Sequence, residues 1–320
     1  MCNNDNSLIF FELYAPKINQ SEYIGDCSFH INKLKSNLNK DKLEQIEIRS
    51  KDKVKLGTLE INYSCSKIIS FEHYIKNGQI NLDIAIDYTD SNGNPNDQNS
   101  LHYMNAKGGN DYEKAIKSCG KIIAYYDYDQ QFPAYGFGGI PQNSDEVSHC
   151  FNINFEKNAE IFGIDNILIK YRESLNGVKL SGNTKFSFVL RKVISNINYD
   201  LKNRKKENHY YILLILTDGV VNDIQDTKDL IVEASYLPLS IVIVGIGNED
   251  FTNMENLDGD EDPLTNSRGE KRKRDIVQFI EFNNFKKNNS INIGTDFAEE
   301  VLKEIPRQID EYYNFCGKFY

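Results

Sequence analysis

The chain has 320 residues, of which 40% are hydrophobic and 26% charged, and its formal net charge at pH 7 is −10. This is the composition of a globular protein with enough apolar residues to bury a core. The negative charge argues against a general nucleic-acid-binding protein, because nothing would offset repulsion from phosphates. We therefore expect no nucleic-acid partner.

Residues 1–65 have the pattern of antiparallel β-structure. Short apolar runs such as SLIFFELY and KLGTLEINYS are separated by polar turns, as in strands joined by hairpins. We interpret this region as a partial β-sandwich. Residues 66–79 are expected to form a linker with a short helix.

From residue 80 to residue 315 the pattern changes to strands that alternate with helices. The expected strands are NLDIAIDY, FPAYGFGG, YYILLILTD, LSIVIVGIG and DIVQFIEF, with helical stretches between them and one final helix over residues 296–313. Such alternation predicts a doubly wound α/β fold, in which helices cover both faces of a mostly parallel sheet.

Zinc sites and secretion signals have no support in the sequence. The six cysteines contain no CxxC pair, and the five histidines are scattered, so a zinc site is not expected. The N-terminus lacks the features of a signal peptide, and no apolar run approaches the ~20 residues that span a bilayer. We expect a cytoplasmic location.

Two of the predicted strands end on an aspartate. Asp87 is followed at intervals of two by Thr89 and Ser91, and Asp218 follows the run LLILT. Because ligands of open α/β sheets bind at the carboxyl ends of strands, we expect these side chains to meet there. Carboxylate and hydroxyl oxygens suit Mg²⁺, and Thr184 offers a further hydroxyl. A single strand-end aspartate more often caps the next turn or helix, but this combination favours a metal site.

These residues resemble the metal-ion-dependent adhesion site (MIDAS) of von Willebrand factor A (vWA) domains, which have a Rossmann-like fold. The stretches AIDYTDSNGNP, SLHYM, YYDYDQQFPAYGFGG and LLILTDGVVND resemble the A domain of copines, with similarity over about residues 70–310. The resemblance implies Mg²⁺ or Mn²⁺ at the site and protein partners that offer an acidic residue to the metal. The implied metal-binding residues are Asp87, Thr89, Ser91, Thr184 and Asp218.

Copines carry two C2 domains, which bind phospholipid membranes in response to Ca²⁺, before the A domain. Residues 1–65 resemble only the second half of a C2 domain, with Tyr14, Pro16 and Glu22 where calcium loops carry aspartates. We therefore expect this chain not to bind the family's Ca²⁺, its C2-mediated membrane targeting to be impaired, and this segment to be loosely ordered or weakly docked. For a full-length form, the resemblance implies peripheral association with the plasma membrane on calcium signals.

Two basic runs are candidates for lipid-binding loops. Residues 202–206 are most simply a solvated loop. The second run fits a solvated loop and a contact with anionic lipid equally well, the latter on a scale of about 1 kcal/mol per basic residue. The lipid-binding candidates are Lys271, Arg272, Lys273 and Arg274.

Three functions are compatible with these features: a copine-type binding protein, a Mg²⁺-dependent enzyme of phosphoryl transfer, and a purely structural A domain. The glycine-containing stretches GFGG and GIG lack the spacing of phosphate-binding loops, and no GxSxG nucleophile elbow is present. We therefore favour the binding protein and expect no enzymatic activity.

Overall fold

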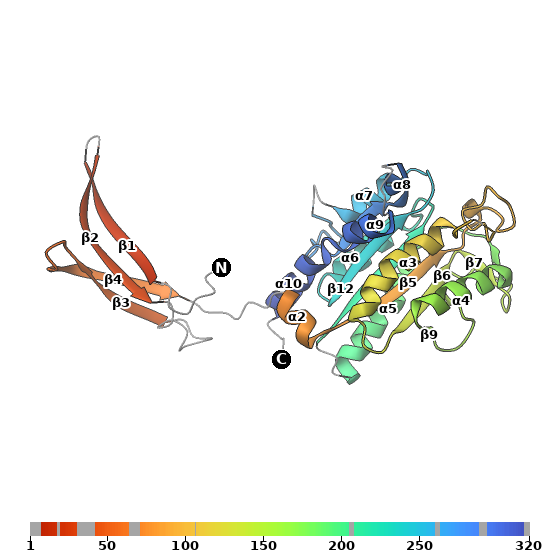
Figure 1. Cartoon of the computed structure of the whole chain (residues 1–320), viewed down its shortest axis with the longest axis horizontal. Helices are drawn as coiled ribbons and strands as arrows, with labels where there is room; N and C mark the ends of the chain where they lie inside the picture. Colours follow the sequence, from red (N-terminus) through yellow and green to blue (C-terminus); the bar gives the residue numbers. More distant parts are fainter. Residues whose placement is uncertain are drawn as a thin grey trace. The chain divides into compact units, whose positions relative to one another are not determined.

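The computed structural model describes residues 8–17, 20–30, 42–63, 71–105, 107–204, 208–259, 263–287 and 293–316. The chain divides into two compact units, residues 1–68 and 69–320 (Figure 1). The linker expected at 66–79 lies partly outside the described residues. Its described part contains the helix α2 (Phe71–Asn77).

The first unit is a four-stranded antiparallel sheet, as the alternating runs predict. Its order is β1-β2-β3-β4. Cys27 is the only described hydrophobic side chain in this unit that is buried, whereas Phe10, Leu13 and Leu56 are exposed. A sandwich buries its core between two sheets, so the described residues of this single sheet form no core of their own. The strands are β1 (Leu8–Lys17), β2 (Gln20–His30), β3 (Lys42–Arg49) and β4 (Lys55–Tyr63).

The second unit is built on a seven-stranded sheet, in which five strands are parallel and β8 and β9 run antiparallel to β6. The order along the sheet is β13-β12-β11-β5-β6-β8. This confirms the doubly wound, mostly parallel fold. The strands are β5 (Gln79–Asp87), β6 (Gln131–Phe137), β8 (Phe151–Asn152), β9 (Glu160–Phe162), β11 (His209–Thr217), β12 (Leu239–Gly245) and β13 (Val277–Glu281), and a separate antiparallel pair is formed by β7 (Gly139–Pro141) and β10 (Val178–Leu180).

Helices cover both faces of this sheet (Figure 1). One face carries α2, α3 (Asp111–Ile123), α4 (Ile164–Gly177), α8 (Phe282–Lys287), α9 (Ile293–Leu302) and α10 (Ile305–Cys316). The other face carries α5 (Ser187–Tyr199), α6 (Ile224–Ala234) and α7 (Thr252–Asp258). Shorter turns are η1 (Asp90–Asn92), η2 (Ala124–Tyr126) and η3 (Asp200–Arg204). Among the described residues, no helix has both the length and the apolar character needed to cross a membrane.

Each central strand contributes to both cores. Along β11, Ile212 and Leu214 pack in the core on the α3 side, while Leu213 and Ile215 pack in the core on the α5 side. Successive side chains of a strand point to opposite faces, so a strand covered on both faces reads as an unbroken apolar run. This explains the run YYILLIL.

The final helix differs from the single helix expected over residues 296–313. α9 ends at Leu302, and α10 begins at Ile305. Pro306 is the second residue of α10. Proline has no backbone N–H and disfavours a helical conformation in the residue before it, so it is tolerated in the first turn of a helix but not in its interior. The expectation of one continuous helix was therefore wrong.

The sheet order places a topological switch point between β5 and β11. From β5 the chain moves to β6 on one side, and later from β11 to β12 and β13 on the other. β5 and β11 are parallel, with Ile86 opposite Leu216, so both strands end at the same edge. Crevices at such points are where open α/β sheets bind ligands.

Candidate metal centre

The candidate site lies where β5 and β11 end side by side. Asp87 is the last residue of β5, and Thr89 and Ser91 occupy the turn that follows it. Asp218 comes directly after the end of β11. The structure therefore brings together side chains that are about 130 residues apart, as the strand-end pattern predicts.

The oxygen atoms of these four residues lie within hydrogen-bonding distance of one another. The Thr89 hydroxyl donates to Oδ1 of Asp87 at 2.6 Å and lies 2.9 Å from the Ser91 hydroxyl. Ser91 donates in turn to Oδ1 of Asp218 at 3.0 Å. Asp87, Thr89 and Asp218 are buried, whereas Ser91 is exposed. The cluster is thus a largely buried pocket of oxygens that reaches solvent at Ser91.

Thr184 reaches the same cluster from the loop between β10 and α5. A Cβ atom built on Gly219 would lie 2.9 Å from the Thr184 hydroxyl and 4.0 Å from the Ser91 hydroxyl. Both hydroxyls therefore border one small space that a side chain at position 219 would fill. This contact gives a physical reason for the glycine after Asp218.

Asp223 fixes the loop that carries Thr184. Its carboxylate accepts hydrogen bonds from the backbone N–H groups of Phe186 at 3.1 Å and Ser187 at 3.0 Å. The backbone N–H of Asn222 donates to the Thr184 carbonyl at 2.9 Å. The segment after β11 therefore supplies Asp218 and also anchors Thr184. Sequence reasoning missed Asp223, because its role depends on contacts between distant loops.

Burial dominates the ionisation of both carboxylates. Burial raises the pKa of Asp87, and hydrogen bonds from Thr217 and Thr89 partly oppose this. Burial raises the pKa of Asp218 to about 7, with the charge of Asp87 as the second cause. Two carboxylates this close repel each other when both are ionised. A divalent cation would remove this repulsion.

The donor set fits a hard divalent cation. It consists of two carboxylates and three hydroxyls, with neither nitrogen nor sulfur, and Mg²⁺ and Ca²⁺ prefer such oxygen ligands. Within the described ranges, no three histidine, cysteine, aspartate or glutamate side chains gather as a metal-binding group. A cation at this site would therefore depend on the hydroxyls of Thr89, Ser91 and Thr184 as well as on the acids.

Several buried residues hydrogen-bond to Asp87 and to the turn that follows it. They were not predicted from the sequence. The Thr217 hydroxyl donates to Oδ2 of Asp87 at 2.5 Å. His102 lies with Nε2 2.9 Å from the Asp87 carbonyl oxygen and Nδ1 2.7 Å from the Tyr171 hydroxyl. Tyr112 donates to Asn92 at 2.6 Å. Thr217 could have been suspected because it directly precedes Asp218, whereas His102 gives no such signal.

His102 is held as a neutral imidazole. Burial lowers its pKa to about 3, and its ring stacks between those of Tyr88 and Tyr112. A histidine that is neutral when folded but protonates near pH 6.5 when unfolded stabilises the fold above that pH and loses this contribution as the pH falls. His102 therefore acts as a hydrogen-bonded support of the strand end.

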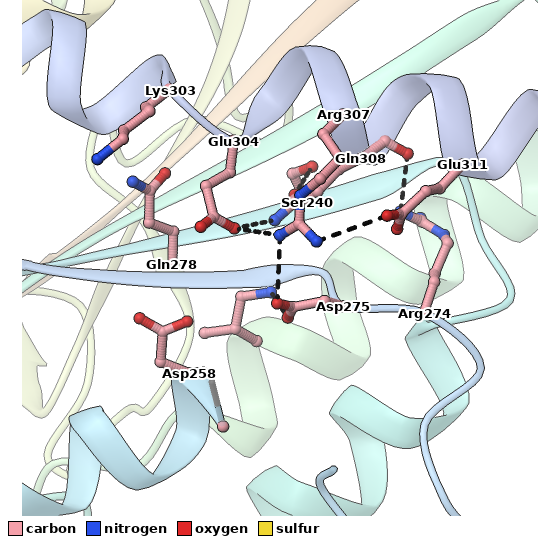
Figure 2. Close-up of polar contacts among 12 residues, drawn as sticks. Ser240, Asp258, Arg274, Asp275, Gln278, Lys303, Glu304, Arg307, Gln308 and Glu311 are labelled. Carbon is pink, nitrogen blue, oxygen red and sulfur yellow. Dashed lines mark hydrogen bonds and ion pairs between the residues drawn. The ribbon is translucent and has the colours of Figure 1, made fainter. Parts of the chain in front are cut away.

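The basic run at residues 271–274 does not form the four-residue lipid-binding surface considered from the sequence. Arg274 is buried beside α10, where it donates to the carbonyls of Gln308 at 3.2 Å and Leu239 at 2.9 Å (Figure 2). Arg272 donates to the carbonyl of Asp258 at 2.6 Å and to Asp275 at 2.7 Å.

This is a correction to the expected set. The two arginines satisfy buried carbonyls, because a guanidinium group can serve several acceptors at once. Only Lys271 and Lys273 of this run are exposed, and the Lys273 ammonium lies 4.5 Å from the centroid of the Phe315 ring.

Taken together, the doubly wound sheet and the residues at its switch point define a vWA domain with the residue pattern of a MIDAS. The copine family model matches residues 100–318, which is more than half of the chain. The chain belongs to the copine family. Thr184 and Asp218 lie within the matched range, while Asp87, Thr89 and Ser91 lie just before it.

Solved structures similar to this chain include several vWA-containing proteins. The manganese-loaded TRAP protein of Plasmodium vivax is 14% identical, over 72% of this chain and 75% of that one, with a TM-score of 0.39. The VWA domain of SpRpn10 is 12% identical, over 70% and 95%, with a TM-score of 0.36. Proximal thread matrix protein 1 of the mussel byssus, with a zinc-occupied MIDAS motif, is 15% identical, over 73% and 45%, with a TM-score of 0.34. These similarities are too low to support an argument about ligands.

Proposed function

We propose that this chain is a copine-type binding protein whose A domain recruits protein partners through one bound Mg²⁺ or Mn²⁺. Asp87, Thr89, Ser91 and Thr184 would hold the cation, and Asp218 would hold it directly or through water. The observation that carries the proposal is the convergence of two carboxylates and three hydroxyls at the switch point. When bound, the cation would supply an electrophilic position open to a further oxygen ligand.

The chemistry of the site favours an acidic partner group. Three of the five proposed ligands are neutral hydroxyls, and five donors leave one position of an octahedral cation open. A partner's aspartate or glutamate could fill that position and complete the coordination. Without the cation, an acidic partner would be repelled by Asp87 and Asp218. Recruitment should therefore depend on the metal.

Apolar side chains beside the site offer contacts for the rest of such a partner. Val220, two residues after Asp218, is 41% exposed, and Phe188 is 48% exposed. Val147 is exposed beside the Thr184 loop, where it would contact a Cβ built on Gly182. Central aromatic and aliphatic side chains supply much of the affinity of protein interfaces. An acidic residue flanked by apolar residues is thus the partner segment that fits this surface best.

The enzymatic alternative receives no support from the residues around Asp87. Both ring nitrogens of His102 are engaged inside the protein, by Tyr171 and the Asp87 carbonyl, so this imidazole is not placed to transfer protons to a substrate. The copine and vWA families act in general as interaction domains without catalysis, which agrees with a binding role.

Membrane association and a cytoplasmic location belong to the proposal by family resemblance. Lys271 and Lys273 are the exposed basic residues of the 271–274 run. Their contribution to binding anionic lipid would be small, on the scale of about 1 kcal/mol per residue.

The test of the proposed function is partner capture by the immobilised full chain in Mg²⁺ and in EDTA. We expect a set of proteins to be retained in Mg²⁺ only. The variant Asp218→Ala should lose the same set, whereas Asp90→Ala, which changes an exposed acid in the neighbouring turn, should keep it. Capture that is identical in Mg²⁺ and EDTA would contradict the proposal and would favour a purely structural A domain.

A further inference from the structure

Asp83 is a buried acid that takes no part in the proposed metal site. It lies in the middle of β5 opposite Leu213 of β11, and its side chain is only 5% exposed. Its neighbour on the same face of the strand, Ala85, belongs to the apolar core. Among the described contacts, the Asp83 carboxylate has no hydrogen bond and no ion pair. Such a group is costly to bury unless something pairs with it.

The Asp83 side chain lines a cavity between the sheet and α5. The cavity has a volume of about 240 Å³, which is below the roughly 300–1,000 Å³ of pockets for drug-sized ligands. Its occupant should therefore be no larger than an amino-acid side chain. Its wall is mostly polar and includes Asn81, Tyr135, Asn196, Asp200 and Tyr211.

Several wall groups already have partners within the protein. The Tyr211 hydroxyl donates to Asp200 at 2.8 Å, and the Asn196 amide donates to the Tyr135 hydroxyl at 3.2 Å. Neither of these side chains donates to Asp83 among the described contacts. The Asp83 carboxylate is thus a buried polar group of the wall without a hydrogen bond among the described contacts.

The charges around the cavity favour a cation. The acids Asp83, Asp129, Glu160 and Asp200 line it, against two lysines, Lys157 and Lys192. Both lysines are exposed, and no ion pair joins either of them to Asp83. The local balance is therefore negative.

The pKa of Asp83 is also consistent with a cavity that favours a cation. Burial raises its pKa to about 7, helped by the charges of Asp200, Asp127 and Glu160 and opposed by that of Lys192. A buried acid regains its ordinary ionisation when a cation is placed beside it.

We propose that this cavity is a binding site for a small ammonium or guanidinium group, with Asp83 as its counter-ion. The Tyr135 hydroxyl, which accepts from Asn196, would accept a further N–H group through its remaining lone pair. The source would be either a free alkylamine or a lysine or arginine side chain, which share this chemistry. The site is separate from the metal centre, because four residues of β5 place Asp83 roughly 13 Å from Asp87.

The test is an NMR titration of the full chain labelled with ¹³C at its aspartate carboxyl groups. Two probes carry the charge, butylamine as a free amine and N-acetyl-lysine methylamide as a side chain, and 1-butanol is the neutral control. We expect the amines to lower the pKa of Asp83 by a unit or more, and to bind at least about fivefold more weakly at pH 5.5 than at pH 8. The tighter of the two amines identifies the source.

Two variants that remove the same charge distinguish the buried Asp83 from an exposed acid that lines the same cavity. Asp83→Asn should abolish amine binding, whereas Asp129→Asn, which alters an exposed acid, should retain it within about threefold. If Asp83→Asn does not fold, the comparison of amine and alcohol on the unaltered chain still decides. Absence of saturable amine binding, or equal binding of 1-butanol, would overturn the proposal. So would binding seen only after Lys192→Met, because Lys192 would then be the cavity's occupant.

Discussion

The Thr217 hydroxyl donates a 2.5 Å hydrogen bond to Oδ2 of Asp87 across the boundary between β11 and β5. The other carboxylate oxygen of Asp87 accepts from Thr89 at 2.6 Å. Both oxygens are therefore held, one by the last residue of β11 and one by the turn after β5, and the carboxylate cannot rotate without breaking a buried hydrogen bond. The orientation of the candidate metal ligand is thus a property of the strand pair and not of the Asp-x-Thr-x-Ser motif alone.

Replacing Asp87 with alanine should abolish divalent-cation binding. The substitution removes a buried carboxylate that lies within hydrogen-bonding distance of Thr89 and Thr217. We expect no measurable heat when Mn²⁺ is titrated into this variant by calorimetry. Asp90→Ala in the adjacent turn should bind as the unaltered protein does. Equal binding by both variants would remove Asp87 from the site.

Replacing Thr217 with valine should weaken metal binding without abolishing it. Valine keeps the shape of the side chain but loses the hydrogen bond to Asp87, and loss of a group that orients a metal ligand costs about 10–100-fold in affinity. We expect the Kd for Mn²⁺ to rise by about tenfold. The control is Thr265→Val, which alters an exposed threonine. An unchanged Kd for Thr217→Val would show that the Asp87 carboxylate does not need this bond.

Metal affinity should fall at acidic pH. The pKa of Asp218 is raised to about 7 by burial and by the charge of Asp87, so below that pH the cation has to displace a proton. Between pH 8 and pH 5.5 we expect affinity for Mn²⁺ to drop by roughly 30-fold. Calorimetry at the two values checks this, and an affinity independent of pH would contradict it.

The raised pKa of Asp218 also makes the stability of the metal-free protein depend on pH. This stability should fall as the pH rises, whereas the metal affinity should increase. The folded state then holds a proton that the unfolded chain releases at about pH 4, so this group lowers the free energy of unfolding as the pH rises from about 4 to 7. Added Mn²⁺ should therefore raise the Tm more at pH 8 than at pH 5.5.

Replacing His102 with alanine should destabilise the A domain by about 3 kcal/mol. The change removes the contacts of the ring to Tyr171 and to the Asp87 carbonyl and opens a cavity between aromatic rings. Urea unfolding measures the difference. His149→Ala is the matched control, because that histidine is only partly buried and its Nδ1 has no hydrogen-bond partner among the described residues. A similar loss in both variants would refute a special role for His102.

The sequence was sufficient to predict the sheet and the primary oxygens, because both follow from local patterns. Unbroken apolar runs marked the buried strands, and the position of Asp87 and Asp218 at strand ends placed them at one edge. The break before α10 was missed, although Pro306 marks it. Thr217 could have been suspected, because it directly precedes Asp218. His102 and Asp223 could not be predicted, because each acts through a contact between segments distant in the chain.

The basic run shows the same limit. Four consecutive charges predict a charged surface, but the four side chains of this bent segment point in different directions. Arg272 and Arg274 turn inward to backbone carbonyls, while Lys271 and Lys273 are exposed. Only the tertiary structure separates the two pairs.

The central claim is that Asp87, Thr89, Ser91, Thr184 and Asp218 bind one divalent cation. The most direct test is a crystal structure of the protein grown with Mn²⁺, using anomalous scattering to locate the metal. We predict one strong anomalous peak, with oxygens of Asp87 and Ser91 at roughly 2.0–2.4 Å and Asp218 bound directly or through water. A Mn²⁺-saturated crystal without a peak at the ends of β5 and β11 would contradict the account.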